Sequence, residues 1–276
     1  MQKTILNQII DYKKKWILSK KKNKPLFYFQ HKITNITRNF YGALKKQKPF
    51  FILECKKKSP SLGLLRKDFN LYKIAQIYKK YASAVSVLTD EKYFNGDFKF
   101  IKKIRHYLDQ PILCKDFFID PYQVYLARYY HADAILLMLS ILNNDEYLNM
   151  SHIAKKMNMD VLTEIHTQKE LKRAIDLNAK IIGINNRNLH DLSINLQNTS
   201  NLAPLIPNNI TVISESGLQT HRQIKYFSKF VGGFLIGSQL MSKKNLDLNI
   251  RSIIFGNNKI CGLTRNIDAK VAAKSG

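Results

Sequence analysis

Between residues 50 and 254, short apolar segments alternate eight times with longer segments of helical periodicity. Runs this short, bounded by polar or turn residues, are typical of buried strands, and they cover residues 50–55, 84–88, 111–114, 134–139, 160–165, 180–184, 210–213 and 233–236. Helices are predicted over residues 70–81, 97–108, 121–130, 143–157, 167–178, 196–203, 219–226 and 240–254. Strands that alternate with helices form a parallel sheet, and eight strands close it into a barrel. The sequence therefore predicts an α/β fold, the (β/α)8 TIM barrel.

An open doubly wound sheet is the alternative arrangement of the same elements. That fold has a glycine-rich turn after its first strand, whereas residues 56–61 read Lys-Lys-Lys-Ser-Pro-Ser. The length of 276 residues is also close to the roughly 250 residues typical of the barrel. Both observations favour the closed barrel.

Two further helices are predicted before the first strand, over residues 2–18 and 33–46. In the first, apolar side chains recur at helical spacing, at Ile5, Ile9, Tyr12 and Trp16. We therefore expect three parts: an N-terminal helical extension (1–48), the barrel (49–255), and a linker with the start of another segment (256–276).

The compartment and the partners are constrained by composition. Three cysteines, an odd number without metal-ligand spacing, indicate free thiols in a reducing compartment. No apolar run approaches the roughly 20 residues of a membrane span, and no apolar signal segment opens the chain. We expect a cytoplasmic protein, a monomer with no membrane partner.

A formal net charge of +25 raises the alternative of a nucleic-acid-binding protein, because clustered lysines neutralise phosphates. The excess lysines, however, run through predicted helices, loops and both ends of the chain. There is no arginine-rich recognition helix and no zinc-finger spacing. This spread favours a background bias in composition, with mild steering of small anionic substrates, over nucleic acid as a partner.

Charged and small polar residues follow most of the predicted strands. Side chains alternate along a strand, so Glu54 and Lys56 are expected on one side and Cys55 on the other. In barrel enzymes the chemistry lies at the C-terminal ends of the strands. The residues expected at that rim are Glu54, Lys56, Thr89, Lys115, Asp116, Leu137, Glu164, Asn185, Arg187, Glu215, Ser216, Gly237 and Ser238.

Two of these residues are candidates for proton transfer. Burial and the neighbouring Lys56 are expected to lower the pKa of Lys115 towards that of a useful general acid. An apolar pocket is expected to raise the pKa of Glu164 towards that of a general base. The alternatives are structural ion pairs, of Lys115 with Asp116 or Glu54, and of Glu164 with a lysine.

The last two predicted strands end in small residues just before a helix, at Ser216-Gly217 and at Gly237-Ser238. Backbone N–H groups there can approach an anion, and phosphate sites after strands seven and eight recur in this fold. The alternative is that both glycines only make tight turns. The seven histidines are scattered, so no metal site is predicted.

Seven segments, in order, resemble the indole-3-glycerol-phosphate synthase family. They are ILECKKKSPSLG (52–63), VLTDEKYFNG (87–96), PILCKDF (111–117), ADAILL (132–137), GINNRNL (183–189), SESG (214–217) and FLIGS (234–238). The resemblance covers roughly residues 1–255. It implies a (β/α)8 barrel with a helical N-terminal extension.

The resemblance also implies a reaction. The family closes the ring of 1-(2-carboxyphenylamino)-1-deoxyribulose 5-phosphate to give indole-3-glycerol phosphate, releasing carbon dioxide and water without a cofactor. Ring closure needs an acid on a carbonyl oxygen, and dehydration needs an acid and a base. A rim with two lysines and a glutamate supplies these groups. Their presence argues against the alternative of a barrel that folds but has lost its catalytic activity.

Residue roles follow from the resemblance, motif by motif. Lys115 would be the general acid and Glu164 the general base, while Lys56 would hold the phosphate and join the proton transfers. Glu54 and Asn185 would orient the sugar hydroxyls and the lysines, with Glu215 supporting the site. The remaining contacts would be to the carboxylate from Arg187 and Ser59, to the phosphate from Ser216, Gly217, Gly237 and Ser238, and to the aromatic ring from Phe94 and Leu136.

The sequence departs from the family pattern at a few positions. His131 replaces a usual glycine at a predicted helix end, where glycine suits the left-handed conformation, so some loss of stability is expected. Gln239 stands where a serine is common, and Asn195 where an aspartate is common; neither changes the expected chemistry.

Residues 259–265 are expected to start a new strand, and residue 266 a helix. This segment resembles the opening of phosphoribosylanthranilate isomerase, which some bacteria fuse after the synthase, and Cys261 matches its general-base position. About 18 residues cannot form a second barrel. We therefore expect a remnant or a truncation, without isomerase activity.

Overall fold

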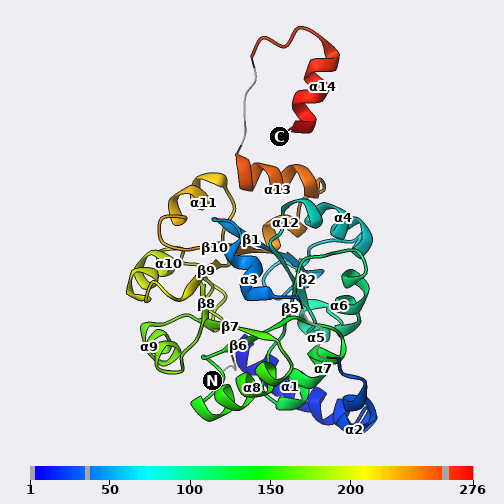
Figure 1. Ribbon diagram of the computed structural model, residues 1–276, viewed down its shortest axis with the longest axis vertical. Coiled ribbons are helices and arrows are strands. Elements are labelled where there is room, and N and C mark those ends of the chain that lie inside the picture. The colour runs from blue at the N-terminus through cyan, green and yellow to red at the C-terminus, as the bar shows by residue number, and fades with distance from the viewer. Residues whose placement is uncertain (1–3, 35–37, 257–260, 276) are drawn as a thin grey trace.

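Eight parallel strands form a closed barrel in the computed structural model, which describes residues 4–34, 38–256 and 261–275 (Figure 1). β1 pairs with both β4 and β10, and these two pairings close the cylinder. The barrel strands are β1 (Phe50–Cys55), β4 (Ala84–Leu88), β5 (Ile112–Lys115), β6 (Ala134–Met138), β7 (Asp160–Ile165), β8 (Ile181–Asn185), β9 (Thr211–Glu215) and β10 (Gly233–Ile236). The predicted barrel is confirmed, and the open doubly wound sheet is excluded.

Strand boundaries differ from the prediction mainly at polar ends. β5, β8 and β9 each continue into a charged or amide residue that the apolar pattern left out. The ladder explains this, because Lys115 pairs in register with Leu88, and Glu215 with Asn185. Backbone pairing continues after the apolar run has ended, and this places the polar side chains on rigid strand ends.

The core has two layers, because successive side chains of each strand point to opposite faces. On β1, Phe50 and Ile52 join an inner cluster inside the cylinder. Phe51, Leu53 and Cys55 join an outer cluster between the strands and the helices. The alternation confirms the expectation that Cys55 faces away from Glu54.

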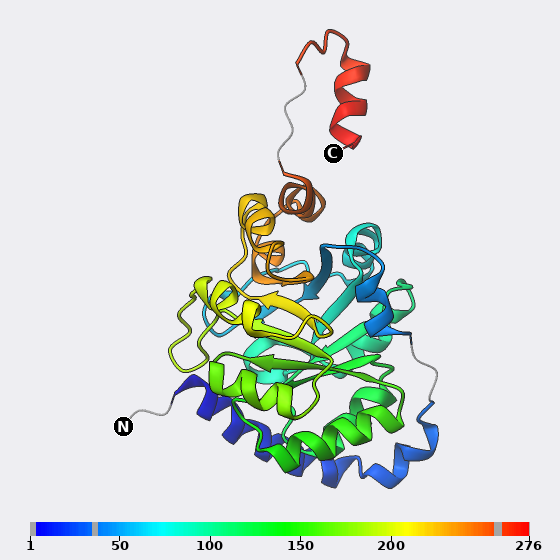
Figure 2. The same ribbon diagram turned by 60° about the vertical axis from the view of Figure 1, so that its left-hand side comes forward.

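Helices cover the outside of the barrel (Figures 1 and 2). They are α4 (Leu71–Tyr81), α6 (Phe98–Arg105), α7 (Pro121–Tyr129), α8 (Asn144–Lys156), α9 (Gln168–Asp176), α10 (Gln197–Leu202), α11 (His221–Phe227) and α13 (Leu246–Phe255). Most begin at a polar side chain that accepts a backbone N–H of the first turn. These caps are Asn70, Asp97, Asp120, Asn143, Thr167, Thr220 and Asn245.

The single helix predicted over residues 240–254 is wrong, because two helices lie there. α12 (Ser238–Met241) follows β10, and α13 begins at Leu246, after the four residues 242–245. The break lies at Asn245, whose side chain caps α13 by accepting the N–H of Leu248 at 3.0 Å. The polar run at residues 242–245, which ends at this cap, marks the break in the sequence.

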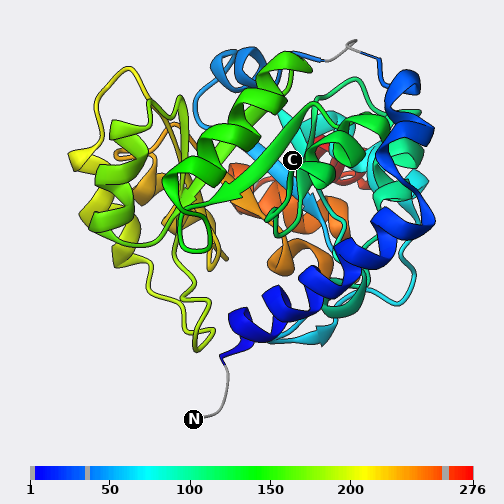
Figure 3. The same cartoon turned by 90° about the horizontal axis from the view of Figure 1, so that it is seen from below.

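The N-terminal segment is helical, but not with the predicted boundaries. α1 (Ile5–Asn23) extends past residue 18, and a short α2 (Leu26–Phe29) and a 3-10 turn, η1 (Gln30–Lys32), follow it. Only α3 (Phe40–Lys45) forms within the range 33–46, of which residues 35–37 lie outside the described structure. Figure 3 shows α1 running across the barrel.

Three short elements lie in the loops. β2 (Lys58–Ser59) and β3 (Gly63–Leu64) form an antiparallel pair after β1, and α5 (Glu91–Phe94) follows β4. A 3-10 turn, η2 (Ala203–Leu205), ends α10. Within the described residues, no helix has the length and apolarity needed to cross a membrane.

The C-terminal segment contributes one helix, α14 (Asn266–Ser275), which stands away from the barrel (Figures 1 and 2). The helix expected from residue 266 is confirmed. The strand expected over residues 259–265 is wrong for residues 261–265, which are not paired, and residues 259 and 260 lie outside the described structure. A strand needs a partner for its backbone groups, and no neighbouring strand is present there in the described part of the chain.

Candidate active site

One cavity of about 320 Å³ opens at the C-terminal ends of the barrel strands. All fourteen side chains or glycines that the sequence analysis assigned to a site line this cavity. They are Glu54, Lys56, Ser59, Phe94, Lys115, Leu136, Glu164, Asn185, Arg187, Glu215, Ser216, Gly217, Gly237 and Ser238. Closure of the barrel brings them together, because they come from all eight of its strands or from the loops that follow them.

Lys115 lies between two carboxylates at the bottom of the cavity. Its Nζ is 3.2 Å from Oε2 of Glu164 and 3.1 Å from Oε2 of Glu215. Burial by itself would lower the pKa of Lys115, but the charges of Glu215 and Glu164 outweigh burial and raise the pKa above the ordinary lysine value. The predicted lowering of this pKa is therefore wrong, and Lys115 is held as an ammonium.

The predicted structural partners of Lys115 are also wrong. The carboxylate of the next residue, Asp116, accepts a hydrogen bond from the Thr89 hydroxyl at 2.7 Å and forms its ion pair with Lys13 instead. Glu54 instead pairs with Lys56, at 2.6 Å between Oε1 and Nζ. Glu54 and Lys56 thus face the same side, as expected. The two lysines of the cavity pair with different carboxylates, Lys56 with Glu54 and Lys115 with Glu164 and Glu215.

Glu215 is almost completely buried, with a relative exposure of 1%. Burial raises its pKa to about 7; the ammonium of Lys115 opposes this shift and the charge of Glu164 adds to it. Gly183 on β8 makes room for this side chain, because a Cβ at Gly183 would collide with a carboxylate oxygen of Glu215. A carboxyl group that titrates near neutral pH therefore contacts Lys115.

Glu164 is oriented by Asn185, whose side-chain amide donates to Oε1 at 3.0 Å. The amide oxygen of Asn185 accepts the backbone N–H of Arg187 at 2.9 Å. One ring nitrogen of His166, Nδ1, lies 2.8 Å from the backbone oxygen of Asn185. His166 therefore contacts the backbone of β8 and does not line the cavity.

Arg187 lies at the rim, on the loop between β8 and α10. Its guanidinium donates to the backbone oxygen of Leu192 at 2.7 Å, and burial lowers its pKa. Leu192 has a φ of 65°, a left-handed conformation that is unfavourable for leucine. The loop therefore holds Arg187 in the cavity without a carboxylate partner among the described contacts.

The two loops predicted to bind phosphate lie side by side in the cavity wall. Ser216 and Gly217 have φ angles of 68° and 82°, so the backbone after β9 turns sharply. Gly237 precedes α12, and a Cβ there would collide with the carboxylate of Glu54. Gly237 therefore has a packing role, whatever anion its loop binds.

Part of the apolar wall was missed by the sequence analysis. Phe94 and Leu136 are joined in the cavity by Ile5, Leu6, Ile9, Leu62, Leu88, Phe117, Met138, Leu189, Leu192, Leu218 and Ile194. The rings of Phe94 and Phe117 lie 6.1 Å apart. The spacing of Ile5 and Ile9 predicted a buried face for α1, but it carries no information on which end of the barrel that face covers.

Metal ligands do not gather in the cavity. Across residues 4–34, 38–256 and 261–275, no group of three or more His, Cys, Asp or Glu side chains could hold a metal ion. The ammonium and carboxylate groups that line the cavity can transfer protons and stabilise charge.

Two solved structures share the fold at low sequence identity. Thiamine phosphate pyrophosphorylase from Pyrococcus furiosus has a TM-score of 0.54 and 14% identity, over 74% of this chain and 93% of that chain. KGPDC from Streptococcus mutans has a TM-score of 0.59 and 12% identity, over 76% of this chain and 97% of that chain. At such identities the likeness concerns the fold alone.

Close relatives in sequence carry the name tryptophan biosynthesis protein TrpCF. Those of Buchnera aphidicola from Schizaphis graminum and from Diuraphis noxia are 64% and 62% identical, over 100% of this chain and 61% of each relative. That of Vibrio cholerae is 53% identical, over 99% of this chain and 58% of the relative. The chain thus spans about three fifths of the length of the curated relatives that it matches.

A family model described as indole-3-glycerol phosphate synthase matches residues 6–253, which include the whole barrel and, except for Ile5, all of α1 and every residue of the cavity described above. The relatives match the same region at more than half identity. The chain therefore belongs to the indole-3-glycerol phosphate synthase family.

Proposed function

We propose that this chain catalyses the synthase reaction of its family, in tryptophan biosynthesis. The substrate is 1-(2-carboxyphenylamino)-1-deoxyribulose 5-phosphate, and the products are indole-3-glycerol phosphate, carbon dioxide and water. The observation that carries the proposal is the cluster of Lys115, Glu164 and Glu215, with contacts of 3.1 and 3.2 Å, inside the cavity at the C-terminal ends of the strands. No cofactor takes part in the reaction as proposed.

Ring closure uses the ammonium of Lys115. An aromatic carbon attacks the ribulose carbonyl carbon, and negative charge develops on the carbonyl oxygen. Lys115 is positioned and charged to donate a proton to that oxygen, and the deprotonated amine recovers a proton from Glu215, whose pKa is about 7. Carbon dioxide then leaves from the ring carbon that made the attack, and the electrons of the broken carbon–carboxylate bond restore the aromatic ring.

Dehydration completes the indole. The hydroxyl formed from the carbonyl leaves as water after it accepts a proton from a lysine, Lys115 or Lys56, and Glu164 removes the proton that must be lost from the new ring. Asn185 holds Glu164 at 3.0 Å for this step. Glu54 holds Lys56 at 2.6 Å, which keeps the second lysine in the cavity.

Both ends of the substrate have proposed contacts. Arg187 and Ser59 bind the anthranilate carboxylate, while the loops at Ser216-Gly217 and Gly237-Ser238 bind the phosphate. Phe94 and Leu136 form walls for the aromatic ring. Fixing the two ends folds a flexible substrate so that the reacting carbons meet, which supplies much of the rate enhancement in such reactions.

Our proposal also covers the oligomeric state, the compartment and the organisation of the chain into segments. The chain acts as a monomer in the cytoplasm, on a small anionic phosphate ester. Residues 1–48 extend a barrel of residues 49–255, and residues 256–276 form a separate segment. We propose no isomerase activity for that segment, since its described residues comprise one helix and an exposed Cys261.

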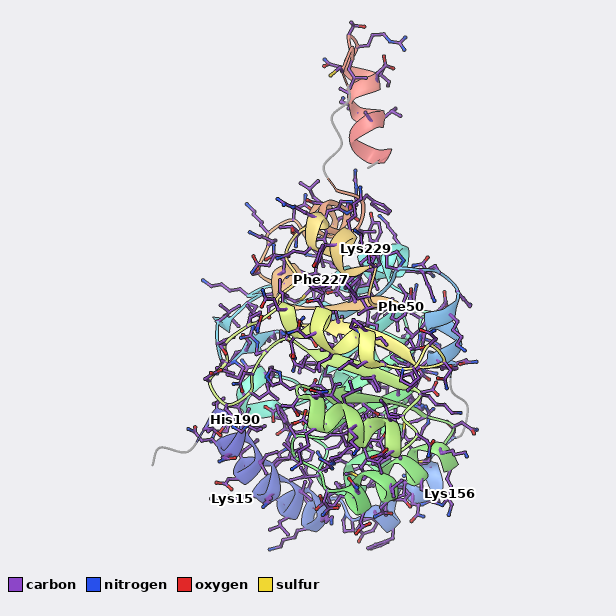
Figure 4. All side chains as sticks on the ribbon, turned by 90° about the vertical axis from the view of Figure 1, so that its left-hand side faces the viewer. Lys15, Phe50, Lys156, His190, Phe227 and Lys229 are labelled. Atoms are coloured by element: carbon purple, nitrogen blue, oxygen red, sulfur yellow. The ribbon has the colours of Figure 1, made fainter. Side chains whose placement is uncertain are left out.

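Nucleic-acid binding is the competing function. The exposed lysines that Figure 4 labels lie on separate parts of the molecule, Lys15 in α1, Lys156 in α8 and Lys229 in the turn after α11. A titration of duplex DNA against salt separates the two functions. Tight binding with a steep salt slope, together with no turnover of the phosphate ester, would favour nucleic acid.

The test of the proposed function is product formation by the purified chain. Indole fluorescence at saturating substrate should rise linearly with time and with enzyme concentration, and the background is low because the chain has one tryptophan. A Lys115→Ala variant purified in the same way controls for contaminating enzyme. A folded wild-type chain with no activity above that control would refute the proposal.

A further inference from the structure

A buried ion cluster joins the N-terminal helix to the barrel beside the cavity. The ammonium of Lys13, on α1, lies 2.8 Å from Oδ2 of Asp90 and 2.6 Å from Oδ1 of Asp116. All three side chains have zero exposure. Burial alone would lower the pKa of Lys13, but the charges of Asp116 and Asp90 raise it above the ordinary lysine value. The cluster is therefore charged.

Each carboxylate of the cluster also fixes a turn of the barrel. Asp90 caps α5 by accepting the N–H of Tyr93 at 2.7 Å. Asp116 accepts the N–H of Phe117 at 2.7 Å and the hydroxyl of Thr89 at 2.7 Å. Lys13 thus connects the loop after β4 with the loop after β5. It does so through Asp90 and Asp116, each of which also accepts a backbone N–H from its own loop.

These two loops carry the two phenylalanines of the cavity. Phe94 lies in α5, four residues after Asp90, and Phe117 directly follows Asp116. Their rings are 6.1 Å apart and line the cavity. A shift of either carboxylate would change the spacing of this aromatic pair.

Helix α1, which carries Lys13, also supplies part of the apolar wall of the cavity. Ile9 lies one helical turn before Lys13, on the same face of α1, and it lines the cavity with Ile5 and Leu6. Ile9 and Leu6 pack in the inner cluster with Phe117 and Leu136. The position of α1 along the barrel therefore sets how closely its apolar side chains approach the aromatic pair.

We infer that Lys13 is a positioning residue, which holds α1 and the Phe94–Phe117 pair in the spacing that grips the aromatic ring of the substrate. This inference rests on the proposed function and adds to it a residue that does not line the cavity. Since Lys13 acts on the ring-binding wall and not on Lys115 or the phosphate loops, its loss should weaken substrate binding more than it slows the chemical steps.

The first variant is Lys13→Met with Asp90→Asn, which removes the ammonium and one of its two carboxylates together. Removing the lysine alone would leave two buried carboxylates without a counter-charge, which is strongly destabilising. Asparagine still caps a helix, so α5 keeps its first turn. We expect KM for the substrate to rise at least about tenfold while kcat changes less than about threefold, and the inhibition constant of inorganic phosphate should stay within about twofold.

A second variant covers the case in which the double variant does not fold. Asp90→Asn alone keeps Lys13 paired with Asp116 and should raise KM by about three- to fivefold, on the scale of one weakened charge pair. The control is Lys20→Met, which removes the exposed contact of α1 with Glu91 at 3.0 Å; it should leave KM within about twofold, as expected for a surface pair.

Trp16 gives a readout that does not depend on turnover. It is the one tryptophan of the chain, is 7% exposed, and has the ammonium of Lys13 at 4.9 Å from its ring centroid. In the double variant, acrylamide should quench Trp16 emission more strongly than in wild type or Lys20→Met.

The outcomes separate this inference from the proposed function. If wild type does not form product, the proposed function fails, and unchanged Trp16 quenching in the double variant would also overturn the positioning role. If wild type is active and the folded variants keep its KM, or if phosphate inhibition weakens as much as substrate binding, the inference is wrong while the proposed function stands.

Discussion

Glu215 combines burial, proximity to an ammonium and a second carboxylate within one small volume. Its Oε2 is 3.1 Å from Lys115, and Lys115 also contacts Glu164. Two carboxylates that share one ammonium cannot both be fully compensated, so the more deeply buried carboxyl group, Glu215, has its pKa raised to about 7. The carboxyl group of Glu215 can therefore bind and release a proton near neutral pH.

This shift predicts a pH dependence of stability. The folded pKa of Glu215 lies above its ordinary value of 4.5, so between these two values the folded chain binds more protons at this group than the unfolded chain does. The stability contributed by this group is full below pH 4.5 and is lost as the pH rises to about 7. Relative to Glu215→Gln, the wild-type free energy of unfolding should fall by at most about 1.4 kcal/mol per pH unit in that window.

Urea unfolding of both proteins at pH values from 4.5 to 8 measures the difference. Asp191→Asn is a suitable control, because Asp191 is exposed on a loop and is not itself one of the residues that line the cavity. A difference between wild type and Glu215→Gln that is flat with pH, or that grows as the pH rises, would contradict the assigned direction of the pKa.

At the scale of a single element, the end of α7 places His131 in a backbone conformation that lowers the stability of the fold. It follows α7 with a φ of 70°, while its N–H donates to Arg128 at 2.8 Å and its backbone oxygen accepts from Arg105 at 3.0 Å. The left-handed conformation expected from the sequence is confirmed. Glycine adopts this conformation without the steric cost that a Cβ imposes.

His131→Gly should therefore stabilise the chain by about 0.5 to 1 kcal/mol, since relief of the left-handed strain exceeds the entropy that glycine gains on unfolding. Both backbone hydrogen bonds remain possible in this variant. His131→Ala is the matched control, because it removes the imidazole but keeps the Cβ. Equal unfolding midpoints for the glycine and alanine variants would show that the strain is not the cause.

The elements themselves were largely predictable, because strand and helix patterns are local. All eight barrel strands follow from apolar runs, and the closed sheet follows from their number. The break between α12 and α13 was missed, although the polar run at residues 242–245 ends in an asparagine, Asn245, that can cap a helix. Likewise, the spacing of Ile5 and Ile9 gives a buried face but not the surface that covers it.

The membership of the site was more predictable than its electrostatics. Strand ends meet at one rim of a parallel barrel, so Glu54, Lys115 and Glu164 were brought together as expected. The pKa of Lys115 was predicted to be lowered, whereas the structure raises it. The prediction failed because the partner that raises the pKa, Glu215, lies 100 residues away in the sequence. Which carboxylate approaches which ammonium depends on side-chain geometry that no local pattern contains.

At the scale of the whole molecule, a net charge of +25 surrounds a cavity that is proposed to bind a phosphate ester with a carboxylate. Such a field attracts an anion over distances comparable to the Debye length, which is about 10 Å at 0.1 M salt and about 3 Å at 1 M. Association should therefore be faster at low salt, whereas the chemical steps inside the cavity should not respond.

Raising NaCl from about 0.05 to about 0.5 M should lower kcat/KM several-fold and leave kcat within about twofold. Steady-state kinetics at five salt concentrations measure both constants, and sucrose solutions of matched osmolarity control for effects other than charge. A kcat/KM that is independent of salt would show that the excess lysines do not steer the substrate.

The central claim is that Lys115 and Glu164 perform the acid and base steps of indole-3-glycerol phosphate formation in this cavity. The most direct measurement is the single-turnover rate of product formation, with enzyme in excess, for wild type, Lys115→Ala and Glu164→Gln. The account predicts that each variant is at least about a hundredfold slower than wild type, the usual scale of acid–base catalysis. A folded variant within about threefold of the wild-type rate would contradict the role of the residue that it lacks.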